Sequence, residues 1–128
     1  MKTNQLTNAL LDYWVARALG VPARELTVEG VPRTANSICV RTRPPHSPAP
    51  ISASEVLDYS TNWALTGPLI ESQNIGLLQY QEGWVAGRKS VGFSGMLPGP
   101  TPLVAACRSI VGDVFGGEVE DWICAQSL

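Results

Sequence analysis

The sequence predicts an α+β domain in which two amphipathic helices pack on a mostly antiparallel sheet. Two segments, residues 8–19 and 102–115, repeat apolar residues at the three-and-four spacing of one helical face. Between them lie short runs with β-branched residues, each bounded by glycine or proline. Helices and strands do not alternate regularly along the chain, which disfavours a doubly wound parallel sheet.

The first helix is predicted over residues 8–19. Thr7 is expected to cap its N-terminus through the hydroxyl, so replacing Thr7 by Ala should cost on the order of 1 kcal/mol. Gly20, which is followed by Val-Pro, supplies the stop. The apolar face consists of Leu10, Leu11, Trp14, Val15 and Ala18.

The segment after this helix predicts two strands and an irregular connection. The strands cover residues 25–29 and 37–43 and are followed by an exposed proline-rich loop at 44–50, where proline lacks the N–H donor that a ladder requires. Residues 55–59 then lead into the segment 60–71. In that segment Gly67-Pro68 indicates a turn, because proline suits the first position of a new helix.

The C-terminal half predicts a hairpin, a loop and the second helix. Residues 75–81 and 83–88 are expected to pair, and residues 90–100 form a glycine-rich loop. The helix at 102–115 has Thr101 as its cap and Gly116-Gly117 as its end, and residues 118–124 are expected to add a last strand. Its apolar face consists of Leu103, Cys107, Ile110, Val111 and Val114.

Length and composition indicate one weakly charged domain spanning residues 1–128. Charged residues make up 16% of the chain, against roughly 25% in typical soluble domains. The net charge of −2 disfavours DNA binding, which usually needs a basic surface. Because few charges accompany four tryptophans, we expect a homo-oligomer, most simply a dimer.

The cysteines and the N-terminus indicate a cytoplasmic protein. Cys39, Cys107 and Cys124 are odd in number and lack CxxC spacing, which fits buried reduced thiols. The N-terminal residues lack the apolar core of a signal peptide, and no apolar run approaches the length of a membrane span.

The sequence spells out no catalytic residue, metal site or cofactor site. His46 is the single histidine and lies among prolines, where a catalytic device could not hold it rigidly. One histidine without a cysteine pair does not make a zinc site. An acid/base pair would arise only if the fold brought two of the scattered carboxylates together.

The start of the second helix is one candidate ligand site. The segment Gly-Arg-Lys-Ser at 87–90 is not a phosphate loop, because the helix begins about ten residues later. The free N–H groups of Leu103 and its neighbour nevertheless form a generic anion-binding geometry behind Thr101, and Arg108 can fold back toward them. The alternative is an ordinary capped helix with Arg108 exposed.

The irregular segment before Gly67-Pro68 is a second candidate. Trp63 follows Tyr59 and Ser60 among polar residues, so its indole is placed to stack on a flat ligand such as a base, or alternatively to anchor the loop in the core. The predicted recess combines both segments and is formed by Tyr59, Ser60, Trp63, Gly67, Pro68, Glu71, Thr101, Leu103 and Arg108.

Four pieces of the chain resemble the NinX-like family of small bacteriophage and prophage proteins. They are Trp84 with Ala86, TNQLTNALLDYWVARALG at 3–20, YSTNWALTGPLIE at 59–71, and GPTPLVAACRSIVGDVFGGEVE at 99–120. The family commonly has Asp where this chain has Asn62. The resemblance implies phage origin and expression in the host cytoplasm, and it brings no activity with it.

Three hypotheses for function follow. The leading one is a non-enzymatic protein that binds a small polar or phosphorylated, nucleotide-like ligand, in one form by sequestering a host defence signal. The second is a protein–protein modulator of a host or phage enzyme. The third is a hydrolase or transferase, which requires a carboxylate pair or an activated nucleophile and would be favoured by Asp58 or Glu71 buried in a cleft with a strongly raised pKa.

Overall fold

The computed structural model describes residues 2–29, 38–42, 54–88 and 95–119. The predictions for the loop at 44–50, for His46 and for Cys124 lie outside these residues, as does most of the predicted strand at 118–124. The helices are α1 (Asn8–Ala18), α2 (Trp63–Ser72) and α3 (Pro102–Phe115), with short 3-10 turns at Thr3–Gln5 and Ala23–Glu25. The predicted α+β class is confirmed, and the two predicted helices lie within one residue of their expected bounds.

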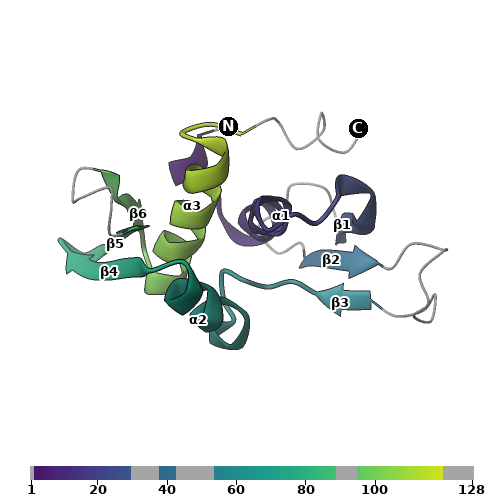
Figure 1. The fold of residues 1–128 in the computed structure, drawn as a ribbon, viewed down its shortest axis with the longest axis horizontal. Helices are drawn as coiled ribbons and strands as arrows, with labels where there is room; N and C mark the ends of the chain where they lie inside the picture. The colour runs from purple at the N-terminus through teal and green to yellow at the C-terminus, as the bar shows by residue number, and fades with distance from the viewer. Residues whose placement is uncertain (1, 30–37, 43–53, 89–94, 120–128) are drawn as a thin grey trace.

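The strands form two antiparallel sheets. The first contains β1 (Leu26–Glu29), β2 (Ile38–Thr42) and β3 (Ser54–Val56), and the second contains β4 (Ile75–Tyr80), β5 (Gly83–Arg88) and β6 (Leu97–Gly99). Antiparallel pairing is as predicted, but the strands are divided between two sheets. In Figure 1 the helix α1 lies beside the first sheet and α3 beside the second.

The core lies where α1 and α3 meet between the sheets. Trp14 of α1 makes edge-on ring contacts with its neighbour Tyr13 and with Phe115 of α3, at centroid distances of 5.2 and 5.4 Å. Cys39 and Cys107 are free thiols in this core, as predicted, and burial raises the pKa of each to about 12. Neither thiol is therefore a nucleophile at neutral pH.

The two long helices begin differently. At α3 the Thr101 hydroxyl accepts a hydrogen bond from the Val104 N–H at 3.1 Å, so the predicted cap is confirmed. At α1 Thr7 occupies the cap position, but its side chain makes no capping bond. The next residue, Asn8, has a φ of 49° in place of the helical value of about −63°, so the start of α1 departs from the geometry in which a cap hydroxyl accepts from the following amides. The predicted side-chain cap at Thr7 is wrong.

This difference predicts unequal costs for two matched substitutions. Thr101→Ala should lower the free energy of unfolding by about 1 kcal/mol, because it removes a formed capping bond. Thr7→Ala should change it by no more than a few tenths of a kcal/mol. Urea unfolding of both variants measures the difference, and equal losses would contradict the assignment of the caps.

The helix α2 runs through the predicted turn at Gly67-Pro68. Asn62 starts it, because its side-chain oxygen accepts a hydrogen bond from the Ala64 N–H at 2.9 Å. Pro68 lies in the helix interior and removes one backbone donor, whose usual acceptor four residues earlier belongs to the exposed Ala64. Water can satisfy that carbonyl, so the helix continues to Ser72 and the predicted turn is wrong.

The second sheet confirms the predicted hairpin and adds a strand. Tyr80 pairs with Gly83 across a two-residue turn in which Gln81 has a φ of 55°. The predicted loop at 90–100 contains β6, which pairs with β5 on the edge of the sheet. Pro98 is tolerated there because an edge strand leaves one side of its backbone unpaired. This segment was expected to be irregular, and for residues 97–99 that expectation is wrong.

Candidate functional site

Arg108 lies on the buried side of α3 and is held by two distant segments. Its Nε donates to the Leu6 carbonyl at 3.0 Å, and its Nη1 donates to the Pro98 carbonyl at 2.9 Å. The residue is 7% exposed, so the alternative of an exposed Arg108 is wrong, and the bond to Pro98 directs the side chain toward the segment that precedes α3. Burial lowers the pKa of the guanidinium from its usual value, although arginine in proteins stays charged.

Arg108 also lines an open pocket of about 550 Å³, which we call the arginine pocket. The pocket is formed by the β4–β5 turn, by β6 and its flanks, and by α3. Its lining residues are Tyr80, Gln81, Glu82, Gly83, Trp84, Val85, Met96, Pro98, Gly99, Pro100 and Arg108.

The charge of Arg108 has no acidic partner among the described residues. The ion pairs there join Arg41 to Glu25 and Arg88 to Asp113, and the bonds of Arg108 go to neutral carbonyls. A buried cation without a counter-ion is costly, because the desolvation of the charge is repaid by no opposite charge. The arginine pocket is therefore suited to an anion.

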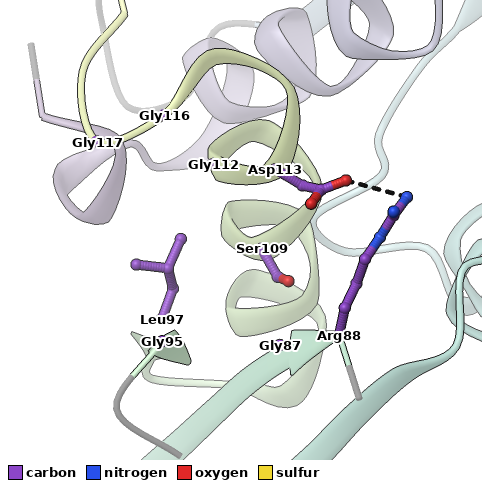
Figure 2. A pocket seen from close by; sticks show the side chains of 9 residues that line it. All are labelled: Gly87, Arg88, Gly95, Leu97, Ser109, Gly112, Asp113, Gly116 and Gly117. Atoms are coloured by element: carbon purple, nitrogen blue, oxygen red, sulfur yellow. Dashed lines mark ion pairs between the residues drawn. The ribbon is translucent and has the colours of Figure 1, made fainter. Parts of the chain in front are cut away.

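A second pocket, which we call the glycine pocket, lies along the C-terminal half of α3 and has a volume of about 270 Å³. Figure 2 shows α3, the end of β5 and the start of β6 around it. Its lining residues are Gly87, Arg88, Gly95, Leu97, Ser109, Gly112, Asp113, Gly116 and Gly117.

An ion pair forms one side of the glycine pocket. Arg88 Nη2 lies 3.0 Å from Asp113 Oδ2 (Figure 2). The same nitrogen donates to the side-chain oxygen of Gln73 at 3.4 Å. Ser109 projects from α3 toward this side of the pocket. The pocket thus combines a neutralised charge pair with a hydroxyl and an exposed glycine backbone.

A buried carboxylate, Asp12 on α1, lies outside both pockets. Its Oδ1 accepts a hydrogen bond from the Ser60 N–H at 2.7 Å. Burial raises the pKa of Asp12 to about 6, against the opposing effect of the hydrogen bond from Ser60, and the nearby Asp58 raises it further. Asp12 lines neither of these pockets. Its hydrogen bond with Ser60 attaches the segment before α2 to α1, so we assign Asp12 a structural role.

The Asp12 pKa predicts how stability depends on pH. The folded-state pKa lies above the ordinary value of 3.8, so the protonated form favours folding. That stabilisation is complete below about pH 4 and is lost as the pH rises through about 6. Asp12→Asn is neutral throughout, so at pH 8 it should be more stable than the wild type by up to about 3 kcal/mol, and at pH 4 about equal.

Urea unfolding of the wild type and Asp12→Asn between pH 4 and 8 measures this effect. The exposed Glu71→Gln provides the control and should leave the profile unchanged. Parallel profiles for the wild type and Asp12→Asn would mean that Asp12 titrates normally in the folded protein.

A family model described as "Bacteriophage P22, NinX" matches residues 2–113. The chain belongs to the NinX family. The match includes every lining residue of the arginine pocket and all of those of the glycine pocket except Gly116 and Gly117. No curated protein matches the chain. Within the described ranges, every helix is too short or too polar to span a lipid bilayer.

Asn62 makes two hydrogen bonds through its side chain. Its oxygen caps α2, and its Nδ2 donates to Asp58 Oδ1 at 3.1 Å. An aspartate here would keep the cap but would place a second carboxylate against Asp58. The Asn62 side chain thus stabilises the start of α2.

The nine predicted site residues are distributed over several places. Tyr59 and Ser60 are buried before α2, and the Thr66 hydroxyl donates to the Tyr59 carbonyl. Trp63 is the first residue of α2 and is 53% exposed, so it does not anchor the core. The remaining members are the interior α2 residues Gly67 and Pro68, exposed Glu71, the cap Thr101, buried Leu103 and buried Arg108.

Of these nine residues, Arg108 alone lines either of the two pockets described above. The helices α2 and α3 are in contact, but the recess shared by Trp63 and Thr101 stays a prediction. Sequence reasoning missed Trp84, Glu82, Ser109 and Asp113 as pocket residues. The sequence carries a signal for Arg108, which is the single charged residue between Pro102 and Gly112, but not for these four residues.

Proposed function

We propose that this NinX-family protein binds a small anionic ligand in the arginine pocket without transforming it. The observation that supports the proposal is the buried guanidinium of Arg108, which lines the pocket and forms no ion pair with a described residue. Its bonds to Leu6 and Pro98 use Nε and Nη1, which leaves Nη2 for a guest. A charge-assisted bond from a fixed guanidinium is about twice as strong as a neutral one.

The other lining residues favour a phosphorylated ligand that also carries a ring. Tyr80 and Trp84 bring aromatic groups to the same pocket, and aromatic side chains stack on bases of any sequence. Glu82, on the turn, supplies an acceptor for ligand hydroxyl or amino groups and disfavours guests with excess negative charge. A nucleotide-like molecule with few charges satisfies these requirements.

The family supports a role for this binding during infection. The chain belongs to a bacteriophage family, and a phage accessory protein that removes a small phosphorylated molecule can act by sequestration alone. We propose that it does so in the host cytoplasm, with a nucleotide-like defence signal as the form of ligand that fits the pocket. The same sequestration requires neither a metal nor a cofactor.

Calorimetry against a matched panel tests the proposal. The panel contains inorganic phosphate, AMP, a cyclic dinucleotide and adenosine, the last lacking any phosphate. We expect heat from at least one phosphate-bearing compound and none from adenosine. Glu82→Gln should bind the same compound equally or more tightly, because it removes a like charge. Equal binding of adenosine and AMP, or no heat from the whole panel, would contradict the proposal.

A second candidate, modulation of another protein, is supported by Trp63. Its indole is 53% exposed at the start of α2, and exposed tryptophan is typical of binding hot spots. Affinity purification from infected cells distinguishes the candidates: a stoichiometric protein lost on Trp63→Ala favours this one, and a co-purifying small molecule favours the first.

Self-association also stays a proposal, and β4 supports it. Leu78 and Tyr80 alternate along this strand and are 47% and 45% exposed, so they share one face at the edge of the second sheet. Uncharged edge strands readily pair with another copy. Light scattering should give a dimer mass that falls to the monomer mass in Leu78→Lys.

A further inference from the structure

The glycine pocket has features that the anion proposal leaves unused. Its charged groups cancel, because the Arg88 guanidinium and the Asp113 carboxylate lie 3.0 Å apart. An ion of either sign therefore gains little by entering, since the attraction of one group is offset by the repulsion of the other. This pocket favours an uncharged guest.

The ion pair also presents a donor beside an acceptor. The contact uses Nη2 of Arg88 and Oδ2 of Asp113, while the second terminal nitrogen of the guanidinium and the second carboxylate oxygen take no part in it. Both side chains are partly exposed, at 41% and 31%. A guest in which a carbonyl adjoins an N–H can accept from the arginine and donate to the aspartate at once.

Arg88 Nε provides an independent indication of a guest. Within the part of the chain that the structure describes, this nitrogen is buried without a hydrogen-bond partner, and Arg88 lines the pocket. Buried polar groups are nearly always satisfied, so an unpaired N–H on a pocket wall is an expected contact for a ligand. Ser109, which is 7% exposed, adds a hydroxyl to the same wall.

The glycines limit the size and shape of that guest. Five of the lining residues lack side chains, namely Gly87, Gly95, Gly112, Gly116 and Gly117. At Gly112 a Cβ would lie 2.8 Å from Leu97 Cδ1, so Leu97 already packs against the backbone there. At Gly116 and Gly117 a Cβ would meet nothing within 4 Å, so a flat ring can approach the backbone at that end of the pocket. The volume of about 270 Å³ suits one small ring system.

We propose that the glycine pocket is a second binding site, for an uncharged ring with an amide-type donor–acceptor edge. Lactams and the keto nucleobases belong to this chemical class. Arg88 donates a hydrogen bond to the carbonyl of the –CO–NH– edge, and Asp113 accepts one from its N–H. The Ser109 hydroxyl bonds a further polar atom of the ring. The site is separate from the arginine pocket, and it does not depend on the anion proposal.

Uracil and 1,3-dimethyluracil are matched probes for this site, because the two methyl groups remove both ring N–H donors without adding charge. Titrations followed by 15N–1H NMR should shift the amide signals of Gly87, Gly112 and Gly116. We expect uracil to bind at least about tenfold more tightly than 1,3-dimethyluracil, as one lost hydrogen bond to a charged acceptor implies. Equal binding of the two compounds, or shifts confined to other residues, would overturn the proposal.

Ser109→Ala separates a binding role from a structural one. Because the proposal has the Ser109 hydroxyl bond the guest and not the protein, the variant should unfold at the same temperature as the wild type and bind uracil about fivefold more weakly. Glu82→Gln, in the arginine pocket, should leave uracil binding unchanged. Unchanged uracil binding in Ser109→Ala, or a lowered unfolding temperature without a change in binding, would contradict the assignment.

Discussion

Gly99→Ala is expected to destabilise the protein by about 3 kcal/mol or more, or to prevent folding. A Cβ at this position would lie 2.5 Å from the Ala105 nitrogen and 2.9 Å from the Ala105 Cα. Both atoms belong to the backbone of α3, so the clash cannot be relieved by a side-chain rotation. Either β6 or the first turn of α3 must move.

Gly76→Ala is the matched control for this prediction. It makes the same substitution in the same sheet, but its Cβ would meet the Gly87 carbonyl at an ordinary 3.7 Å. Urea unfolding should therefore show a change of less than about 1 kcal/mol for Gly76→Ala. Similar losses in the two variants would mean that the approach of β6 to α3 does not determine the cost.

Arg108→Met should abolish most of the binding to the arginine pocket. It keeps a long side chain and removes the charge, and the loss of a hydrogen bond to a charged group is worth about 2 to 3 kcal/mol. This corresponds to a loss of affinity of about 30- to 150-fold for the phosphate-bearing ligand found by calorimetry. The same change leaves the Leu6 and Pro98 carbonyls without their donor, so some stability is lost as well.

Arg108→Lys is the companion variant that separates charge from stability. It keeps the charge but loses the planar fork that reaches two carbonyls at once. We expect it to retain more affinity than Arg108→Met at a comparable loss of stability. Thermal unfolding and calorimetry on both variants measure the two effects separately, and equal affinities for the two would show that the charge is irrelevant to binding.

The parts of the fold that depend on local pattern could be predicted from the sequence. The spacing of apolar residues gave α1 and α3, the Thr101-Pro102 pair gave the start of α3, and the hairpin followed from two β-rich runs beside a short polar turn. In each case residues close in sequence determine the structure, so the prediction needed no knowledge of distant contacts.

The errors come from proline and from contacts across the chain. Pro68 was interpreted as a helix start, although an exposed helix can accommodate one missing donor. Pro98 and Gly99 are typical of loops, yet β6 pairs at a sheet edge where proline is tolerated. Neither outcome depends on local preference alone.

The candidate site could be predicted only in part for the same reason. Arg108 was identified, but its orientation is fixed by the Leu6 carbonyl, 102 residues away in sequence, and by Pro98 in a strand that was not expected. The Arg88–Asp113 pair likewise joins β5 to α3 across a loop. Such pairings follow from the packing of the second sheet on α3, which no local pattern encodes.

The most direct test of the anion site is the side-chain NMR signal of Arg108. Its Nε–H is buried and bonded to the Leu6 carbonyl, so it should exchange slowly with water and give a resolved signal that is missing in Arg108→Met. Saturation with the phosphate-bearing ligand should shift this signal, while adenosine should not. Ligand saturation that leaves the Arg108 signal unmoved would contradict the account.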